Sequence, residues 1–336
     1  MLVTDLTGDR VEKAEQAGAY QRLRDIEVAL YFMVYDLLPI QMPEAFPPDA
    51  SDVHERWLKA VCCIADGVIC DSKTIADELT EWLETNGPNR MRPLKIGWFH
   101  LGADVNNSMP TSGLLNDAQQ VLAQLAVRPS FLMVGTIEPR KGYLQTIAAF
   151  NQLWDLGVDV NLVIVGKVGW KGVIDEMRRT IPTIVEMLIH HPKKGVRLFW
   201  LEGISDEYLE KIYAASTCLI AASDGEGFGL PLIEAAQHKL PIISRDISVF
   251  HEVAGEHAFY FKGKEPADLA RAVQEWLALY RSDLHQKTDD LLWQTWKQST
   301  QQLLGVILWN KWHTEWRNIK TGTCSRKLPI CQNGII

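Results

Sequence analysis

The sequence predicts an α/β protein with two domains, each built on a parallel sheet. Between residues 129 and about 280, short apolar strands alternate with amphipathic helices, which is typical of βαβ units in a parallel sheet. Two of these strands run into glycine-containing loops, at residue 135 and at residues 225–229, and ligands bind beyond the carboxyl ends of such strands. A chain of 336 residues is long enough for two domains of ordinary size.

The composition is that of a globular protein, with 47% hydrophobic and 23% charged residues. A net charge of −8 argues against a nucleic-acid partner and gives no general attraction to anionic membranes. The sequence has no apolar run of 18 residues, so we expect no transmembrane helix. Residues 1–10 carry acids and lack the apolar segment of a secretory signal. The six cysteines lack metal-site spacing, so we expect buried, reduced thiols in a cytoplasmic protein.

The N-terminal part, residues 1–108, is expected to form a lobe of αβ units. A polar stretch follows it, and we place the inter-domain linker at 109–118. Apolar runs predict strands and amphipathic runs predict helices. The expected strands are 29–35, 67–70 and 95–99, and the expected helices are 11–24, 51–63 and 73–85.

The second domain is expected at residues 119–285. Its predicted strands are 130–135, 161–165, 197–201, 217–222, 240–243 and 258–261. Its predicted helices are 143–155, 172–190, 206–215, 231–238 and 266–279. This alternation predicts a parallel sheet with helices on its faces.

The most informative segment is the loop that follows the strand 217–222. Its glycines allow sharp turns and close approach of a ligand to the backbone, and they are Gly225, Gly227 and Gly229. Pro231 is well placed to open a helix, whose N-terminal N–H groups favour an anion such as a diphosphate. Glu226 and Glu234 frame this loop, and we interpret them as acceptors for sugar or ribose hydroxyls.

A second anion site is predicted after the strand 130–135. Arg140 and Lys141 lie where the next helix begins, a position at which the helix dipole disfavours cations. An anionic ligand would explain them, because Arg and Lys both bind phosphate; the alternative is a pair of solvated surface cations. Gly166 and Lys167 follow a third strand end, where the glycine would admit a ligand and the lysine could reach phosphate.

These segments resemble the retaining glycosyltransferases of the GT-B fold, family 4. Glu226 and Glu234 have the Glu-x7-Glu spacing of that family. The segment from Gly135 through Arg140 and Lys141 to the following glycine matches the family's pyrophosphate-binding segment. Its residue sequence resembles that of a subgroup that includes many polysaccharide mannosyltransferases. The resemblance therefore implies a GT-B architecture, with two Rossmann-like domains and parallel sheets.

The resemblance also implies roles for individual residues. Glu226 would hold sugar hydroxyls and stabilise positive charge at the anomeric carbon, and Glu234 would accept hydrogen bonds from the ribose. Asp36 matches the family's strand-to-loop motif as a second catalytic residue, although Tyr35 stands where many members have His; the alternative is a turn or cap aspartate. The diphosphate would be held at Gly135, Gly166 and Lys167, by Arg140 and Lys141, and by the backbone of Gly227, Phe228, Gly229 and Leu230.

The implied reaction is a retaining transfer of a hexose, with mannose favoured, from a nucleotide sugar to a glycan or lipid-linked glycan acceptor in surface polysaccharide synthesis. GDP-mannose is favoured over UDP-hexose through the subgroup resemblance. No cofactor and no metal are expected, since no Asp-x-Asp motif occurs and family members of this type are metal-independent. An NAD-dependent oxidoreductase is disfavoured, because no Gly-x-Gly-x-x-Gly follows a first strand.

The N-terminal domain departs from the family pattern. Complete members have further βα units before the segment that holds Asp36, whereas only about 25 residues precede the first predicted strand here. We therefore expect an incomplete N-terminal Rossmann-like domain. The alternative function is a catalytically impaired, nucleotide-sugar-binding GT-B remnant, which would bind the donor without turnover.

Tryptophans gather near the C-terminus. Trp309, Trp312 and Trp316 recur at helical spacing, and we expect helices at 286–318 that pack back on the N-terminal lobe. The alternative is a membrane-surface helix, which would place the protein peripherally at the inner membrane face. Residues 319–336 show no periodicity and are expected to be a disordered tail.

Overall fold

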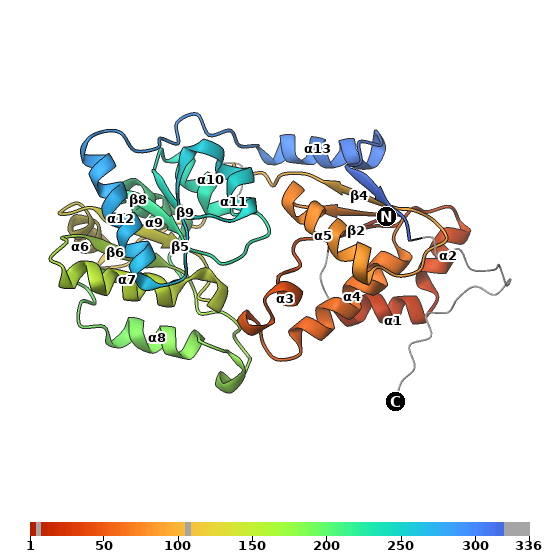
Figure 1. Cartoon of the computed structure of the whole chain (residues 1–336), viewed down its shortest axis with the longest axis horizontal. Helices are drawn as coiled ribbons and strands as arrows, with labels where there is room; N and C mark the ends of the chain where they lie inside the picture. The colour runs from red at the N-terminus through yellow and green to blue at the C-terminus, as the bar shows by residue number, and fades with distance from the viewer. Residues whose placement is uncertain (5–7, 105–108, 319–336) are drawn as a thin grey trace.

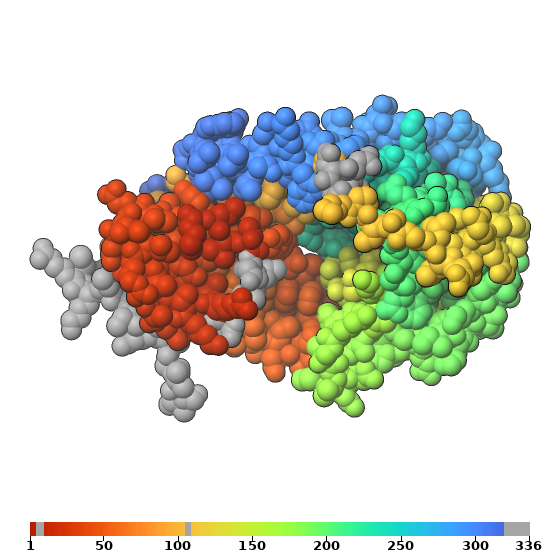
Figure 2. All heavy atoms as spheres, turned by 180° about the vertical axis from the view of Figure 1, so that it is seen from behind, coloured from red at the N-terminus to blue at the C-terminus, as the bar shows by residue number. Residues whose placement is uncertain are grey.

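The structure is a computed structural model, and it describes residues 1–4, 8–104 and 109–318. Two lobes lie side by side, and each has its own sheet (Figure 1). Seen from behind, the C-terminal part of the chain extends across both lobes (Figure 2). Within the described ranges, none of the helices combines the length and the hydropathy that a membrane span requires.

The C-terminal lobe is built on a six-stranded parallel sheet, in the order β10-β9-β8-β5-β6-β7. The strands are β5 (Ser130–Val134), β6 (Asn161–Val165), β7 (Leu198–Leu201), β8 (Cys218–Ala221), β9 (Ile242–Arg245) and β10 (Ala258–Phe261). The helices are α6 (Ala118–Leu125), α7 (Tyr143–Asp155), α8 (Ile181–His190), α9 (Asp206–Ala215), α10 (Leu230–Gln237), α11 (Ser248–Ala254) and α12 (Pro266–Arg281).

Helices cover both faces of this sheet because successive strand residues point to opposite sides. Phe131 and Met133 of β5 belong to a core shared with α7, α8 and α12, and Leu132 belongs to a second core shared with α9 and α10. The strand order changes direction between β5 and β8. In open parallel sheets such a switch point opens a crevice for ligands, and both predicted anion loops start there.

The N-terminal lobe has the strand order β1-β2-β3-β4-β11, in which β1 to β4 are parallel and β11 is antiparallel. The strands are β1 (Leu2–Val3), β2 (Tyr31–Val34), β3 (Gly67–Cys70), β4 (Leu94–Trp98) and β11 (Thr314–Trp316). The helices are α1 (Gly8–Gln16), α2 (Ala19–Asp25), α3 (Leu38–Gln41), α4 (Ala50–Ile64) and α5 (Lys73–Asn86). The absence of further βα units relative to complete family members stays a prediction.

Two predicted helices were wrong in extent. The segment 11–24 is not one helix, because Gly18 adopts φ 68° between α1 and α2, a left-handed conformation that glycine tolerates. The segment 172–190 becomes a short 3-10 turn at Asp175–Met177 and then α8. Arg179 has φ 54° between them, and a residue in that conformation cannot continue an α-helix.

The C-terminal tryptophans are not on one helix, which corrects that prediction. Helix α13 (Trp296–Leu308) ends before Trp309, and Trp316 lies in β11. Trp316 is 3% exposed and joins the core of the N-terminal lobe. Trp312 packs so closely on β3 that a Cβ at Gly67 would lie 2.6 Å from its ring. The segment therefore docks on the N-terminal lobe through a strand as well as a helix. The tail predicted to be disordered, 319–336, lies outside the described residues.

Candidate functional site

The loop between β8 and α10 has the geometry of an anion site. Gly229 precedes the helix with φ 107°, and a Cβ there would lie 2.9 Å from the ring of Phe250, so the turn requires glycine. Pro231 lies in the first turn of α10, where its missing N–H costs no hydrogen bond. The N–H of Leu232 already donates to the carbonyl oxygen of Gly229 at 3.0 Å, so the N–H of Leu230 is the donor that the first turn of α10 offers to an anion.

Glu226 forms ion pairs with both of the cations that are predicted to bind phosphate. Lys141 Nζ lies 2.5 Å from its Oε1, and Arg140 Nη1 lies 2.7 Å from its Oε2. Ser223 Oγ donates to Oε1 at 2.6 Å. Burial opposes ionisation of Glu226, but Lys141 and Arg140 outweigh it and lower its pKa. The two anion segments thus form one cluster, and Arg140 and Lys141 are not solvated surface cations, since each side chain is 16% exposed.

This cluster closes the space into which a diphosphate would have to fit. The cavity beside Lys141, Glu226 and Gly229 has a volume of about 20 Å³, which is room for about one water molecule. Glu226 also lines a larger cleft of about 480 Å³ between the lobes, opposite Leu38 and Met42. A ligand that enters from this cleft would compete with Glu226 for the two cations.

The remaining C-terminal candidates lie in different surroundings. Glu234 accepts a hydrogen bond from Tyr213 Oη at 2.6 Å, and burial raises its pKa. A Cβ at Gly166 would lie 1.8 Å from the carbonyl oxygen of Gly135, so these glycines permit close packing of two strand ends. Lys167 is exposed, and the ion pairs of Glu226 among the described residues are with Arg140 and Lys141.

The carboxyl end of the N-terminal sheet carries two acids. Asp36 follows β2, and its Oδ1 accepts from Leu38 N at 3.1 Å, which fits the alternative of a turn aspartate. Burial also raises its pKa, and Arg140 is among the charges that oppose this effect. Asp71 follows β3 and is 4% exposed. Burial, with Asp36 as the next cause, raises its pKa to about 8.

Asp71 was not among the predicted site residues. Only its position at the end of a predicted strand could have indicated it, and an aspartate in that position is also common as a turn residue. Its neighbour Ser72 donates from Oγ to the carbonyl oxygen of Gly227 at 2.8 Å. This bond ties the N-terminal lobe directly to the glycine loop.

Glu252 of α11 forms a second contact between the lobes. It accepts from the N–H groups of Lys73 and Thr74 at 2.7 Å, and from Thr74 Oγ1 at 2.6 Å. These groups form the first turn of α5, where unpaired N–H groups favour a carboxylate. His100 Nε2 lies 2.7 Å from Glu252 Oε1. Sequence patterns could not reveal this contact, because it joins residues more than 150 positions apart.

We expect Glu252→Gln to weaken the fold most at neutral pH. Burial alone would raise the pKa of Glu252, but the hydrogen bonds from His100, Thr74 and Lys73 lower it to about 2, below its ordinary value of 4.5. A carboxylate with a depressed pKa contributes stability above its unfolded pKa, and this contribution is lost as the pH falls toward its folded pKa. The full difference should be about 2 kcal/mol after allowance for solvent screening.

Urea unfolding at pH 7, 5 and 3.5 measures this difference. The gap between wild type and Glu252→Gln should hold from pH 7 to 5 and shrink at pH 3.5. Glu256→Gln, an exposed glutamate after the same helix, is the matched control and should follow wild type. A gap that does not change with pH would contradict the assignment to the carboxylate charge.

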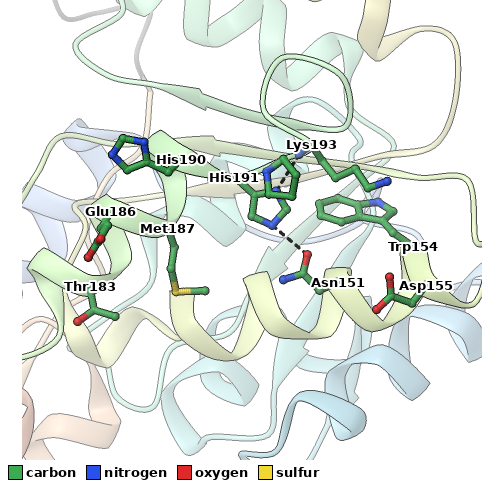
Figure 3. A pocket seen from close by; sticks show the side chains of 10 residues that line it. Asn151, Trp154, Asp155, Thr183, Glu186, Met187, His190, His191 and Lys193 are labelled. Carbon is green, nitrogen blue, oxygen red and sulfur yellow. Dashed lines mark hydrogen bonds between the residues drawn. The ribbon is translucent and has the colours of Figure 1, made fainter.

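A groove of about 570 Å³ lies elsewhere, between α7 and α8 (Figure 3). One of its polar side chains is held by two neighbours: His191 Nε2 lies 2.9 Å from Asn151 Oδ1, and His191 Nδ1 accepts from the backbone N–H of Lys193 at 3.1 Å. Burial lowers the pKa of His191, which favours its neutral form. The groove is lined by none of the predicted site residues, so its size does not make it the donor site.

The comparisons with known proteins bear on the family and the fold of this chain. The family model described as "Glycosyl transferases group 1" matches residues 119–289. The chain is 48% identical over 315 residues to a protein described as "Serotype-specific mannosyltransferase WbdA" from Escherichia coli, an alignment that covers 90% of this chain and 36% of that protein. The chain thus spans about a third of the length of this relative.

Solved structures with the same fold include sucrose-phosphate synthase from Thermosynechococcus elongatus, with a TM-score of 0.63 and 21% identity over 86% of this chain and 69% of that chain. Anabaena Alr3699/HepE in complex with UDP and glucose has a TM-score of 0.65 and 17% identity over 91% of this chain and 77% of that chain. At these identities the likeness shows the fold alone, and it confirms the predicted GT-B class.

Proposed function

The chain belongs to the glycosyl transferases group 1 family, and on this premise we propose that it is a retaining, metal-independent hexosyltransferase. It moves a hexose, with mannose favoured, from a nucleotide sugar to a glycan acceptor in surface polysaccharide synthesis. The observation that carries this proposal is the cluster of Arg140, Lys141 and Glu226 beside the N-terminus of α10. It brings two cations that suit a diphosphate and a carboxylate that suits sugar hydroxyls into one site.

The cations would act on the leaving group. As the bond between the anomeric carbon and the phosphate oxygen breaks, its electron pair stays with the diphosphate. Arg140, Lys141 and the Leu230 N–H at the start of α10 would stabilise that charge by preorganised electrostatics. Glu226, released from the cations by the diphosphate, would turn to the hexose hydroxyls and to the positive charge at the anomeric carbon.

The acceptor would enter through the cleft between the lobes. Its volume of about 480 Å³ is in the range of small-molecule sites. The acceptor hydroxyl oxygen bonds to the anomeric carbon on the face that the phosphate leaves, and the hydroxyl proton passes to the departing phosphate oxygen. Glu234 is proposed as the ribose contact, which requires Tyr213 to share or release it.

The proposal of a mannose donor and an O-polysaccharide acceptor is supported by the relative named as a serotype-specific mannosyltransferase.

We propose a cytoplasmic location. Peripheral contact with the inner membrane face is the alternative interpretation of the exposed apolar side chains on and beside α13, which are Trp293, Trp296, Leu304, Leu308 and Trp309. A nucleotide-sugar-binding protein without turnover stays the alternative function, which follows from the incomplete N-terminal domain that the sequence predicts.

Thermal-shift titration of the purified chain with GDP, UDP and ADP, each with and without its sugar, tests the proposal. A ligand that binds only the native state raises the Tm as it saturates the site. We expect GDP and GDP-mannose to raise the Tm, and release of GDP from GDP-mannose when a mannan acceptor is added. Binding without release would favour the alternative function, and no shift with any nucleotide would contradict both.

A further inference from the structure

The carboxyl group of Asp71 is buried without a complete set of partners. Its Oδ1 is fully inaccessible to solvent and has no hydrogen-bond partner among the described residues. Its Oδ2 lies 3.4 Å from where a Cβ on Gly227 would be, so the side chain lies against the glycine loop. A buried carboxyl oxygen left unpaired costs free energy, and in a native protein such a group needs an explanation, for example a functional role or a bound water or ion.

The surroundings of Asp71 define the chemistry of the missing partner. Asp36, Glu226 and Glu252 are the charged groups that act on it, and all of them repel its charge. No lysine or arginine among the described residues forms an ion pair with it, and no group of three metal-ligating side chains occurs in the same part of the chain. This buried oxygen therefore suits an uncharged hydrogen-bonding group, such as a hydroxyl, rather than a phosphate.

The position of Asp71 indicates which hydroxyl this is. Gly227 adjoins Glu226, the residue of the C-terminal lobe that we propose to bind the hexose. Asp71 faces the same loop from the N-terminal lobe, and Ser72 holds the two together. A hexose bound at Glu226 would thus have a carboxyl group on either side.

We propose that Asp71 is a hexose-binding residue of the N-terminal lobe, which hydrogen-bonds a hydroxyl of the sugar carried by the nucleotide donor. This inference rests on the proposed function. It assigns specificity for the sugar to a contact made only when the two lobes are closed, whereas the nucleotide is held by the C-terminal lobe alone. Loss of Asp71 should therefore separate binding of the sugar from binding of the nucleotide.

Isothermal titration with GDP and with GDP-mannose tests this separation in the full chain. Asp71→Asn should bind GDP within two-fold of wild type and GDP-mannose at least ten-fold more weakly. Asp52→Asn, an exposed aspartate of α4 in the same lobe, should bind both as wild type does. Asp71→Ala is the second variant and should show the same selective loss.

The thermal stability of Asp71→Asn gives an independent readout. The folded state holds a proton on Asp71 that the unfolded state releases at neutral pH, so this carboxyl group destabilises the fold there. Asparagine removes that cost, and the Tm should rise while sugar binding falls. A lower Tm with equal loss of GDP and GDP-mannose would show a structural role and overturn the inference, as would unchanged GDP-mannose binding. If wild type binds neither ligand, the proposed function itself fails.

Discussion

Replacing Lys141 by Ala is expected to lower kcat/KM for hexose transfer by about 10²–10³-fold, as the loss of one preorganised group that stabilises developing charge typically does. The ammonium group lies 2.5 Å from Glu226 and is 16% exposed, so its field acts in surroundings that water screens weakly. Because the charge on the diphosphate grows as the glycosidic bond breaks, most of the effect should fall on kcat. Steady-state assays of nucleotide release measure both constants.

Two variants control for this effect. Lys141→Arg keeps the charge and should retain part of the rate, because the guanidinium differs from the ammonium in shape and reach. Lys211→Ala removes a lysine of α9 whose side chain is 44% exposed and should leave the rate within two-fold of wild type. A rate for Lys141→Ala within two-fold of wild type would show that this lysine does not contact the reacting diphosphate.

Most of the fold of the C-terminal lobe could be predicted from local patterns, although the short helices α6 and α11 were not among the predicted elements. Strand β6 and helix α7 have the predicted bounds, because each is a short apolar or amphipathic run bounded by turn residues. The predictions failed where a backbone conformation breaks the pattern, as at Gly18 and Arg179. They also failed at Trp316, whose place in β11 depends on pairing with a strand more than 200 residues earlier.

The candidate site could be predicted only in part, for a similar reason. Arg140, Lys141 and Glu226 were found because each lies at a strand end in a recognisable loop, and the structure brings them together. Their roles in binding and catalysis stay predictions. Asp71 and Glu252 acquire their surroundings from the other lobe, and no single-segment pattern encodes a contact across two domains.

The structure also indicates what donor binding must change. In the present arrangement Glu226 pairs with both Arg140 and Lys141, and about 20 Å³ of space remains beside them. A diphosphate can enter only if Glu226 moves and the lobes separate at the contacts of Ser72 and Glu252. The closed arrangement is therefore expected to be one of two states, and donor affinity should depend on how easily these contacts open.

Replacing Arg245 by Met is expected to destabilise the fold by about 3–5 kcal/mol, the usual cost of removing one member of a buried, hydrogen-bonded ionic network. Arg245 is 6% exposed at the end of β9. Its guanidinium donates to the carbonyl oxygens of Ala222 and Gly263 and to the side chain of Gln145, and its Nε lies 3.3 Å from Asp224 Oδ1. Methionine keeps much of the volume but leaves these acceptors without donors.

The same substitution should loosen the glycine loop, since Ala222 and Asp224 lie at its start. Urea unfolding followed by tryptophan fluorescence measures the loss of stability, and titration with GDP measures the expected loss of affinity. Arg271→Met removes an arginine of α12 whose side chain is 63% exposed and pairs with Asp268; it should change stability by less than about 0.5 kcal/mol. Equal stabilities of Arg245→Met and Arg271→Met would show that the buried network does not hold the loop, and the affinity for GDP should then stay unchanged as well.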